Sequence, residues 1–201
     1  MNSFKLTAVG DALCSEKIYK SFENNGRYDF SGLLSELTID ENNLNYYNQE
    51  SLIGGKNLGL CGSISKQINN HKQAHFNSPH EFAEEIIKNN FNMVSLSNNH
   101  TLDKNIMGVK HSLNFWKDKG VITAGSYKEY NDDIILNHIH EKNGIKFAFF
   151  SYTTKINSKY NYNNLPYLRH DFNYQSVKHD IELVKDKVDL IIVAMHWGNE
   201  Y

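Results

Sequence analysis

The most constraining feature of this sequence is the repeated alternation of apolar, strand-like runs with segments of helical periodicity. The apolar runs at residues 4–10 and 189–195 are typical of buried strands, and amphipathic helical spacing recurs between them. Such β-α-β alternation predicts a layered α/β fold with a central, mostly parallel sheet. There is no internal repeat and no linker, so a single domain over residues 1–201 is expected.

The expected elements follow from periodicity and from turn signals. Helices are favoured at residues 30–37, 79–90, 106–119 and 177–188. Strands are favoured at residues 4–10, 44–50, 91–96, 121–124, 134–140, 145–152 and 189–195. Asn143-Gly144 predicts a tight turn that makes the strands on either side of it an antiparallel hairpin. Residues 51–77 and 154–171 are expected to be long loops, the second either a flap that contacts substrate or plain filler.

The helix expected at residues 79–90 has the clearest start signal. Ser78 is expected to cap it, Pro79 suits its first position, and Glu81 stands three residues after Ser78 as in a capping box. Phe82 and Ile86 are expected on its inward face.

Composition and charge exclude several classes of protein. Among the 201 residues, 21 Lys and Arg stand against 23 Asp and Glu, a net charge of -2 that gives no broad basic field for nucleic acid. Cys14 and Cys61 form no CxxC pair, which argues against a zinc knuckle, a dithiol redox motif and a disulfide-dense scaffold. No apolar run approaches the roughly 20 residues that span a bilayer. The N-terminus also lacks the pattern of an export signal, so a cytoplasmic location is expected.

Polar side chains that suit metal chemistry follow four of the expected strands. These residues are Asp11, Glu50, Asn99-His100 and His196. Because the carboxyl ends of parallel strands meet at one edge of a sheet, they are expected to lie together. Carboxylate, carboxamide and imidazole groups suit Mn, Fe, Zn or Mg rather than a metal that seeks thiolates. A site for two metal ions needs a bridging carboxylate, and Glu50 is the natural candidate.

Each of these residues also has a plain structural interpretation. Taken singly, Asp11 after a glycine is more often a turn residue, and Glu50 in a polar stretch is more often a solvated charge. Asn99 lies in an asparagine-rich chain, and a lone His196 after a buried strand is more often structural. The coincidence of four such positions favours a site. The other histidines are interpreted as surface or structural residues: His71, His75, His80, His111, His138, His140, His170 and His179.

The order of these motifs resembles that of a known family. Gly10-Asp11, Asn48-Gln49-Glu50, Asn98-Asn99-His100 with Asp103, and His196-Trp197-Gly198 with Glu200-Tyr201 are similar to the CapA family of bacterial capsule and poly-gamma-glutamate synthesis proteins. The resemblance covers nearly the whole chain, and the NNHxxD and HWGxEY motifs together are specific. It implies a sandwich similar to the calcineurin-like metallophosphoesterases.

The resemblance also implies a role for each motif residue. Asp11 is expected to hold a first metal ion, Glu50 to bridge two ions, and Asn99 and His196 to bind the second ion. His100 is the expected proton donor to a leaving oxygen, and Asp103 is placed to orient its ring. The resemblance thus implies two divalent ions and a hydrolytic attack by metal-bound water.

Several consequences for partners and location follow from the resemblance. The substrate would be an anionic polymer or a phosphoester, and other capsule-synthesis proteins at the membrane would be partners. A cell-envelope role is therefore expected beside the cytoplasmic location. Proteins of this family continue past HWGxEY into a segment of Gly-His-x-Pro-His type that supplies further histidine ligands. This chain is therefore expected to be incomplete at its C-terminus, with part of its metal-ligand set missing.

Three functions remain open at the level of the sequence. The first is a metal-dependent hydrolase of phosphoester or cell-envelope polymer bonds. The second is a polymer-binding or capsule-assembly factor on the same fold that cuts no bond. The third is an inactive truncated fragment.

Overall fold

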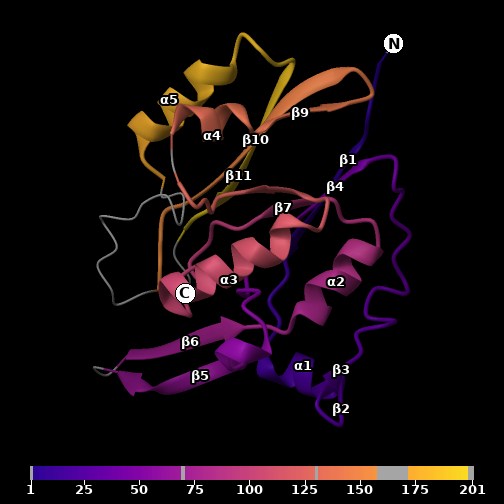
Figure 1. The fold of residues 1–201 in the computed structure, drawn as a ribbon, viewed down its shortest axis with the longest axis vertical. Coiled ribbons are helices and arrows are strands. Elements are labelled where there is room, and N and C mark those ends of the chain that lie inside the picture. The colour runs from indigo at the N-terminus through magenta and orange to yellow at the C-terminus, as the bar shows by residue number, and fades with distance from the viewer. Residues whose placement is uncertain (1, 69–70, 130, 158–171, 199–201) are drawn as a thin grey trace.

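The chain forms a layered α/β structure (Figure 1), as predicted. The structure is a computed structural model that describes residues 2–68, 71–129, 131–157 and 172–198, apart from the side chains of residues 64–73. Its strands are β1 (Leu6–Asp11), β2 (Glu23–Asn24), β3 (Arg27–Tyr28), β4 (Leu44–Asn48), β5 (Cys61–Ile68), β6 (His71–Asn77), β7 (Met93–Ser95), β8 (Ile122–Ala124), β9 (Ile139–Lys142), β10 (Ile145–Thr153) and β11 (Leu190–His196). Its helices are α1 (Glu16–Ser21), α2 (His80–Lys88), α3 (Asn105–Lys117), α4 (Asp132–Leu136) and α5 (Tyr174–Val184), with a 3-10 turn at Lys56–Leu58.

Two sheets form the centre of the molecule. The first has the order β1-β4-β7-β8, and all of its neighbouring strands are parallel. The second has the order β11-β10-β9, in which β10 is parallel to β11 and antiparallel to β9. The predicted parallel sheet is therefore confirmed, while the last strand, β11, belongs to the second sheet.

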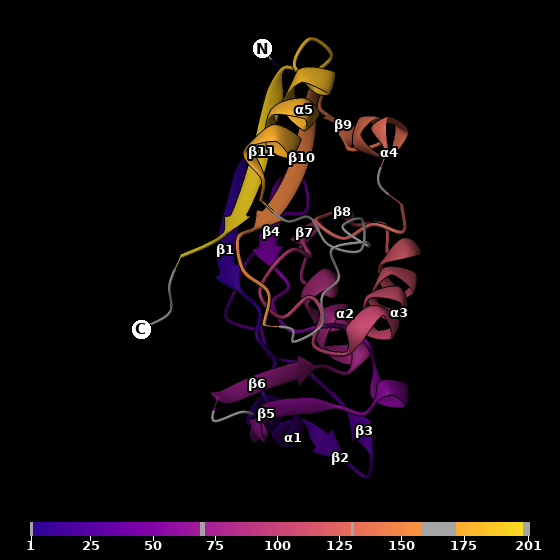
Figure 2. The same ribbon diagram turned by 90° about the vertical axis from the view of Figure 1, so that its left-hand side faces the viewer.

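The two sheets pack face to face and helices cover their outer faces. Phe147 and Phe149 of β10 pack between the sheets against Leu44 and Met93 of the first sheet. Because side chains of a strand alternate between its two faces, Phe150 points to the opposite side and packs with α4 and α5. A third cluster joins the other face of the first sheet to α1, α2 and α3. Figure 2 shows α5 over β10 and β11 in the upper part of the view, and α2 and α3 lower down, below β7 and β8.

The strands β1 and β11 are more exposed than the sequence pattern predicted. Both were expected to be buried, but each lies at an edge of its sheet. The side chains of Leu6 and Val9 on β1 and of Leu190 and Val193 on β11 are 40–43% exposed. An apolar run indicates a strand, but it does not distinguish a central strand from an edge strand.

Three of the predicted segments are wrong. Residues 132–136 form the short helix α4 in place of the first part of the strand expected at residues 134–140. Residues 30–37 form turns instead of a helix, and Gly32 has a φ of +86°, which lies outside the helical region. Residues 51–77, expected to be a loop, contain the antiparallel hairpin of β5 and β6. This hairpin is polar and packs against α1 at its Cys61 end, so it lacks the apolar alternation by which a strand is recognised.

Other predictions hold in outline and differ at the ends of elements. The N-cap of α2 is Pro79 instead of Ser78, and the helix lacks a side-chain cap because proline has no side-chain acceptor; the Ser78 hydroxyl donates to the Ser51 hydroxyl. The Asn143-Gly144 turn joins β9 to β10 as predicted, with positive φ at both residues. The predicted 154–171 loop lies largely outside the described residues, and none of the described helices is long and apolar enough to cross a membrane.

Candidate functional site

Asp11 is brought to the site by an irregularity in β1. Ala8 pairs with Tyr46 of β4, but the register shifts before Asp11, which pairs with Asn48. Such a bulge turns the following side chain relative to a regular strand. Asn48 then donates from Nδ2 to Asp11 Oδ1 over 2.8 Å. The Asp11 carboxylate is half exposed, so it remains open to a ligand.

Asn48 is the centre of a row of polar side chains across the first sheet. It pairs in register with Asp11 on one side and with Ser95 of β7 on the other. The Ser95 hydroxyl donates to Asn48 Oδ1 over 2.7 Å, and Tyr46 Oη lies 2.9 Å from the same hydroxyl. The motif comparison included Asn48 without a role. Asn48 could have been identified from the sequence, because it lies two residues before Glu50 and, in a strand, on the opposite face from its neighbour Tyr47.

His196 reaches this row from the second sheet. It ends β11 and pairs with Thr153 of β10, whose hydroxyl donates to the His196 carbonyl over 3.0 Å. Its Nδ1 lies 3.4 Å from Asn48 Nδ2 and 3.9 Å from Asp11 Oδ1. Its Nε2 lies 3.1 Å from Asn99 Oδ1. The structure therefore brings together three of the predicted metal ligands: Asp11, Asn99 and His196.

The predicted proton donor and its orienting carboxylate are in contact. His100 Nδ1 lies 2.7 Å from Asp103 Oδ2, and both side chains are buried. The Phe76 amide also donates to Asp103 Oδ2, over 2.6 Å, which fixes the carboxylate from the end of β6. On the other side of the ring, His100 Nε2 lies 4.0 Å from Glu50 Oε1. The catalytic roles of His100 and Asp103 stay predictions.

The loop that carries Asn99 and His100 is held by its neighbour Asn98. The Asn98 carboxamide donates to the Gln49 carbonyl over 2.9 Å and accepts the His100 amide over 3.0 Å. Thr101 closes the loop by accepting the Asn98 amide over 3.0 Å. A backbone amide that donates to an asparagine side chain two residues earlier is typical of tight turns. Of the two asparagines in the motif, Asn98 therefore shapes the loop and Asn99 faces the site.

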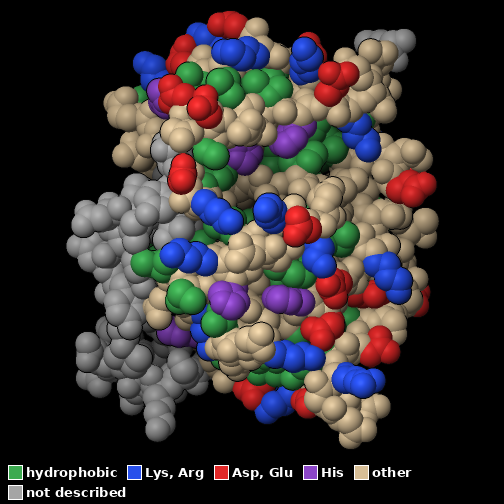
Figure 3. Space-filling view, in the orientation of Figure 1, with side chains coloured by type: hydrophobic (Ala, Val, Ile, Leu, Met, Phe, Trp, Pro, Cys, Tyr) green, Lys and Arg blue, Asp and Glu red, His purple; other side chains and the backbone are tan. Residues whose placement is uncertain are grey.

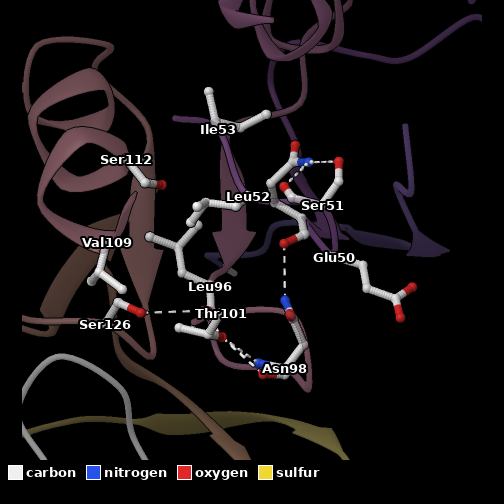
Figure 4. A pocket seen from close by; sticks show the side chains of 11 residues that line it. Glu50, Ser51, Leu52, Ile53, Leu96, Asn98, Thr101, Val109, Ser112 and Ser126 are labelled. Atoms are coloured by element: carbon white, nitrogen blue, oxygen red, sulfur yellow. Dashed lines mark hydrogen bonds between the residues drawn. The ribbon is translucent and has the colours of Figure 1, made fainter. Parts of the chain in front are cut away.

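Three cavities lie near these residues. One of about 400 Å³ borders Asp11 and is lined mainly by apolar side chains, among them those of Ile18 on α1 and Phe82 on α2. The remaining two differ in kind. One of about 200 Å³ lies between the two sheets and is lined by polar groups of Asp11, Asn48 and His196. The other, beneath α3, holds only about 10 Å³, which is room for about one water molecule. Figure 4 shows Glu50 at its rim with the carboxylate directed away from it. Of these three, the cavity between the sheets is the one that combines a polar lining with room for part of a substrate.

The donor chemistry fits a divalent metal ion in part. Two ligands bonded to one ion at about 2.1 Å lie roughly 3.0–3.4 Å apart, and Asn99 Oδ1 and His196 Nε2 are separated by 3.1 Å. Among the residues that the structure describes, however, no group of three or more His, Cys, Asp and Glu side chains lies as metal ligands would. The described chain therefore supplies a fitting donor pair with Asp11 beside it, rather than a complete coordination shell.

The surface charge is mixed on the face that is turned toward the viewer in Figures 1 and 3. Lys and Arg side chains alternate with Asp and Glu side chains across the face drawn in Figure 3. No broad region of a single sign is visible on that face, so it favours neither anionic nor cationic partners.

Comparisons with known proteins agree with the motif order. The sequence profile of a family described as "Bacterial capsule synthesis protein PGA_cap" matches residues 5–201. The chain is also 24% identical over 136 residues to the capsule biosynthesis protein CapA of Bacillus anthracis. That match covers 65% of this chain and 32% of the relative, so the matched stretch spans about a third of the relative's length.

Proposed function

Because the chain belongs to the PGA_cap family of bacterial capsule synthesis proteins, we propose that it carries a metal-dependent hydrolase site that acts in capsule biosynthesis. The family that the motifs indicated is thereby confirmed, and the layered α/β fold is the metallophosphatase-like fold expected of it. The proposed substrate is a phosphoester or an anionic cell-envelope polymer such as poly-gamma-glutamate. The observation that carries the proposal is the 3.1 Å approach of His196 Nε2 to Asn99 Oδ1, across the two sheets.

The proposed metal ligands are Asp11, Glu50, Asn99 and His196. When bound, divalent ions at these residues would acidify a water molecule and neutralise the charge that develops on the substrate. Asp11 lies 3.9 Å from His196 Nδ1, and both residues line the cavity between the sheets. Part of the substrate would occupy that cavity, whose volume of about 200 Å³ suits a small group rather than a long chain.

His100 is proposed to deliver the proton to the leaving oxygen. Asp103 accepts a hydrogen bond from His100 Nδ1, so the proton for transfer is the one on Nε2. The Phe76 amide holds Asp103 in place, and this contact limits rotation of the imidazole about its own axis. The edge of the Phe76 ring packs on the same imidazole, with ring centroids 4.7 Å apart.

Alanine substitutions at the proposed ligands test the proposal directly. Glu50→Ala and His196→Ala should abolish Mn²⁺-dependent turnover of a generic phosphodiester or phosphomonoester, because each removes a proposed ligand. His100→Ala should lower turnover by about 10²–10⁴-fold, the usual contribution of a general acid. His179→Ala is the matched control, since His179 lies on the surface next to Asp132. Wild-type turnover in both ligand variants would refute the proposal.

A second candidate function is the binding of an anionic polymer without cleavage. It is favoured by the lack, among the described residues, of three clustered His, Cys, Asp or Glu side chains. Binding of poly-gamma-glutamate to the wild-type chain in the presence of a chelator, with no turnover on added Mn²⁺, would favour this alternative.

A further inference from the structure

The side chain of Asn48 is buried and has its two polar ends in different surroundings. It is 5% exposed, in the middle of the row that runs from Asp11 to Ser95. A buried carboxamide must satisfy both its oxygen and its NH₂ group, so its orientation follows from its neighbours. Those neighbours come from three strands and one loop.

The oxygen of Asn48 is held by two donors. Ser95 Oγ donates to Asn48 Oδ1 over 2.7 Å, and Asn98 Nδ2 approaches the same atom at 3.4 Å. A hydroxyl has a single proton, and Ser95 uses it on Asn48. The 2.9 Å contact between Tyr46 Oη and Ser95 Oγ must therefore be donated by Tyr46. Hydrogen bonding thus runs in one direction, from Tyr46 through Ser95 to Asn48 Oδ1. A flip of the amide would set its oxygen against the Asp11 carboxylate and its NH₂ group against Asn98 Nδ2.

With its oxygen fixed, the NH₂ group of Asn48 must face the site. It donates to Asp11 Oδ1 over 2.8 Å and lies 3.4 Å from His196 Nδ1. An NH₂ group has no acceptor, so the ring nitrogen that faces it is the one without a proton in the neutral imidazole. The proton then resides on Nε2, where Asn99 Oδ1 lies 3.1 Å away and accepts it.

We propose that Asn48 is a positioning residue that fixes the Asp11 carboxylate and keeps the proton of the neutral His196 ring on Nε2. A single side chain can do both, because one hydrogen of the Asn48 NH₂ group faces Asp11 Oδ1 and the other faces His196 Nδ1. Both effects apply to the metal-free chain. Their relevance to catalysis rests on the proposed function: His196 would lose the proton on Nε2 when that atom binds a metal ion, and the Asp11 carboxylate would already point into the cavity.

The tautomer is measured by long-range ¹H–¹⁵N correlation spectra of the metal-free, ¹⁵N-labelled chain at pH 8, with His196→Gln used to assign the His196 signals. The wild type should show the Nε2-protonated form, and Asn48→Leu should show a mixture of both tautomers. Tyr46→Phe and Ser95→Ala, which remove the donors that orient the amide, should shift the signals in the same direction by a smaller amount. These two milder variants keep the test decisive if Asn48→Leu fails to fold.

Asn45→Leu is the matched control. Asn45 is a buried asparagine of the same strand, but its carboxamide donates to the Asp40 and Asn90 carbonyls at the other end of β4. This variant loses comparable hydrogen bonds and should leave the His196 tautomer unchanged. A wild-type ring protonated on Nδ1, or an unchanged tautomer in Asn48→Leu, Tyr46→Phe and Ser95→Ala together, would overturn the inference.

A second readout separates this inference from the proposed function. Calorimetric titration with Mn²⁺ should show affinity lowered by about 10–100-fold in Asn48→Leu, as for other residues that orient a metal ligand. If the wild type binds no Mn²⁺, the proposed function fails while the spectra still decide the role of Asn48. If the wild type binds Mn²⁺ and Asn48→Leu binds it equally well, Asn48 does not position the ligands.

Discussion

At the scale of single residues, the site is built from buried polar side chains that satisfy one another. Asp103 is the clearest case, because one of its oxygens accepts from both the Phe76 amide and His100 Nδ1. It thereby joins the end of the β5–β6 hairpin to the loop after β7. A charged acceptor in such a buried position contributes to stability as well as to orientation.

Asp103→Asn should destabilise the fold by about 1–3 kcal/mol, because a neutral carboxamide oxygen is a weaker acceptor than the carboxylate for the Phe76 amide and His100 Nδ1. Urea unfolding followed by circular dichroism measures this loss. Asp186→Asn, at an exposed aspartate after α5, is the control and should change stability by less than about 0.5 kcal/mol. Equal stability of the two variants would show that the Asp103 contacts do not stabilise the fold.

The histidine His140 should make the stability of the fold depend on pH. Burial lowers its pKa below the usual value, and its ring packs on Phe147 between the sheets. Above about pH 6.5 the ring is neutral in both the folded and the unfolded chain. As the pH falls below that value the unfolded chain takes up a proton more readily, so stability present at higher pH is lost.

The free energy of unfolding should therefore decrease between pH 7.5 and pH 5.5, and His140→Phe should reduce that decrease. Phenylalanine keeps a ring against Phe147 and cannot be protonated. Urea unfolding at both pH values gives the two slopes. Identical pH dependence in the variant and the wild type would show that His140 makes no contribution.

At the scale of elements, the helices and strands with a strong hydrophobic periodicity could be predicted from the sequence. The helices α2, α3 and α5 and the strands β4, β7 and β8 were found near their expected positions, and the Asn143-Gly144 turn joins the expected strands. The β5–β6 hairpin was missed because its residues are mostly polar and lack the apolar alternation of a half-buried strand. The bulge before Asp11 could not be predicted either, because it depends on pairing with β4.

Some parts of the site could likewise be predicted from the sequence, and others could not. The chemistry of Asp11, Asn99 and His196 was visible in the sequence, because each follows a strand. That His196 comes from the second sheet, and that Asn48 lies between it and Asp11, depends on packing of the two sheets. Periodicity describes one strand at a time and contains no information about which sheet faces which.

Packing of the hairpin on α1 gives a prediction at this scale. An added methyl group at Gly62 of β5 would collide with backbone atoms of Ser15 and Glu16 at the start of α1, which cannot move aside as a side chain could. Gly62→Ala should therefore destabilise the fold by about 1–3 kcal/mol, as overpacking does. The midpoint of thermal unfolding measures the effect.

Gly10→Ala in β1 is the matched control, because a methyl group there meets no atom within 4 Å. It should change stability by less than about 0.5 kcal/mol. If Gly62→Ala were as stable as Gly10→Ala, the close approach of β5 to α1 would not hold in solution.

At the scale of the whole molecule, the site depends on two sheets that meet face to face. Asp11 and Asn99 come from the first sheet and its loops, and His196 from the second, so no single layer contains the proposed ligand set. Phe147 and Phe149 hold the sheets together beneath the cavity. Burying a side chain of this kind contributes roughly 1.5–3 kcal/mol, so the position of His196 relative to Asn99 is maintained by the core.

We propose that this junction binds a divalent metal ion, which calorimetric titration of the metal-stripped chain with Mn²⁺ tests. We expect saturable binding by the wild type, at least about tenfold weaker binding by His196→Ala, and wild-type binding by the control His179→Ala. Absence of binding by the wild type, or equal affinity of wild type and His196→Ala, would contradict it.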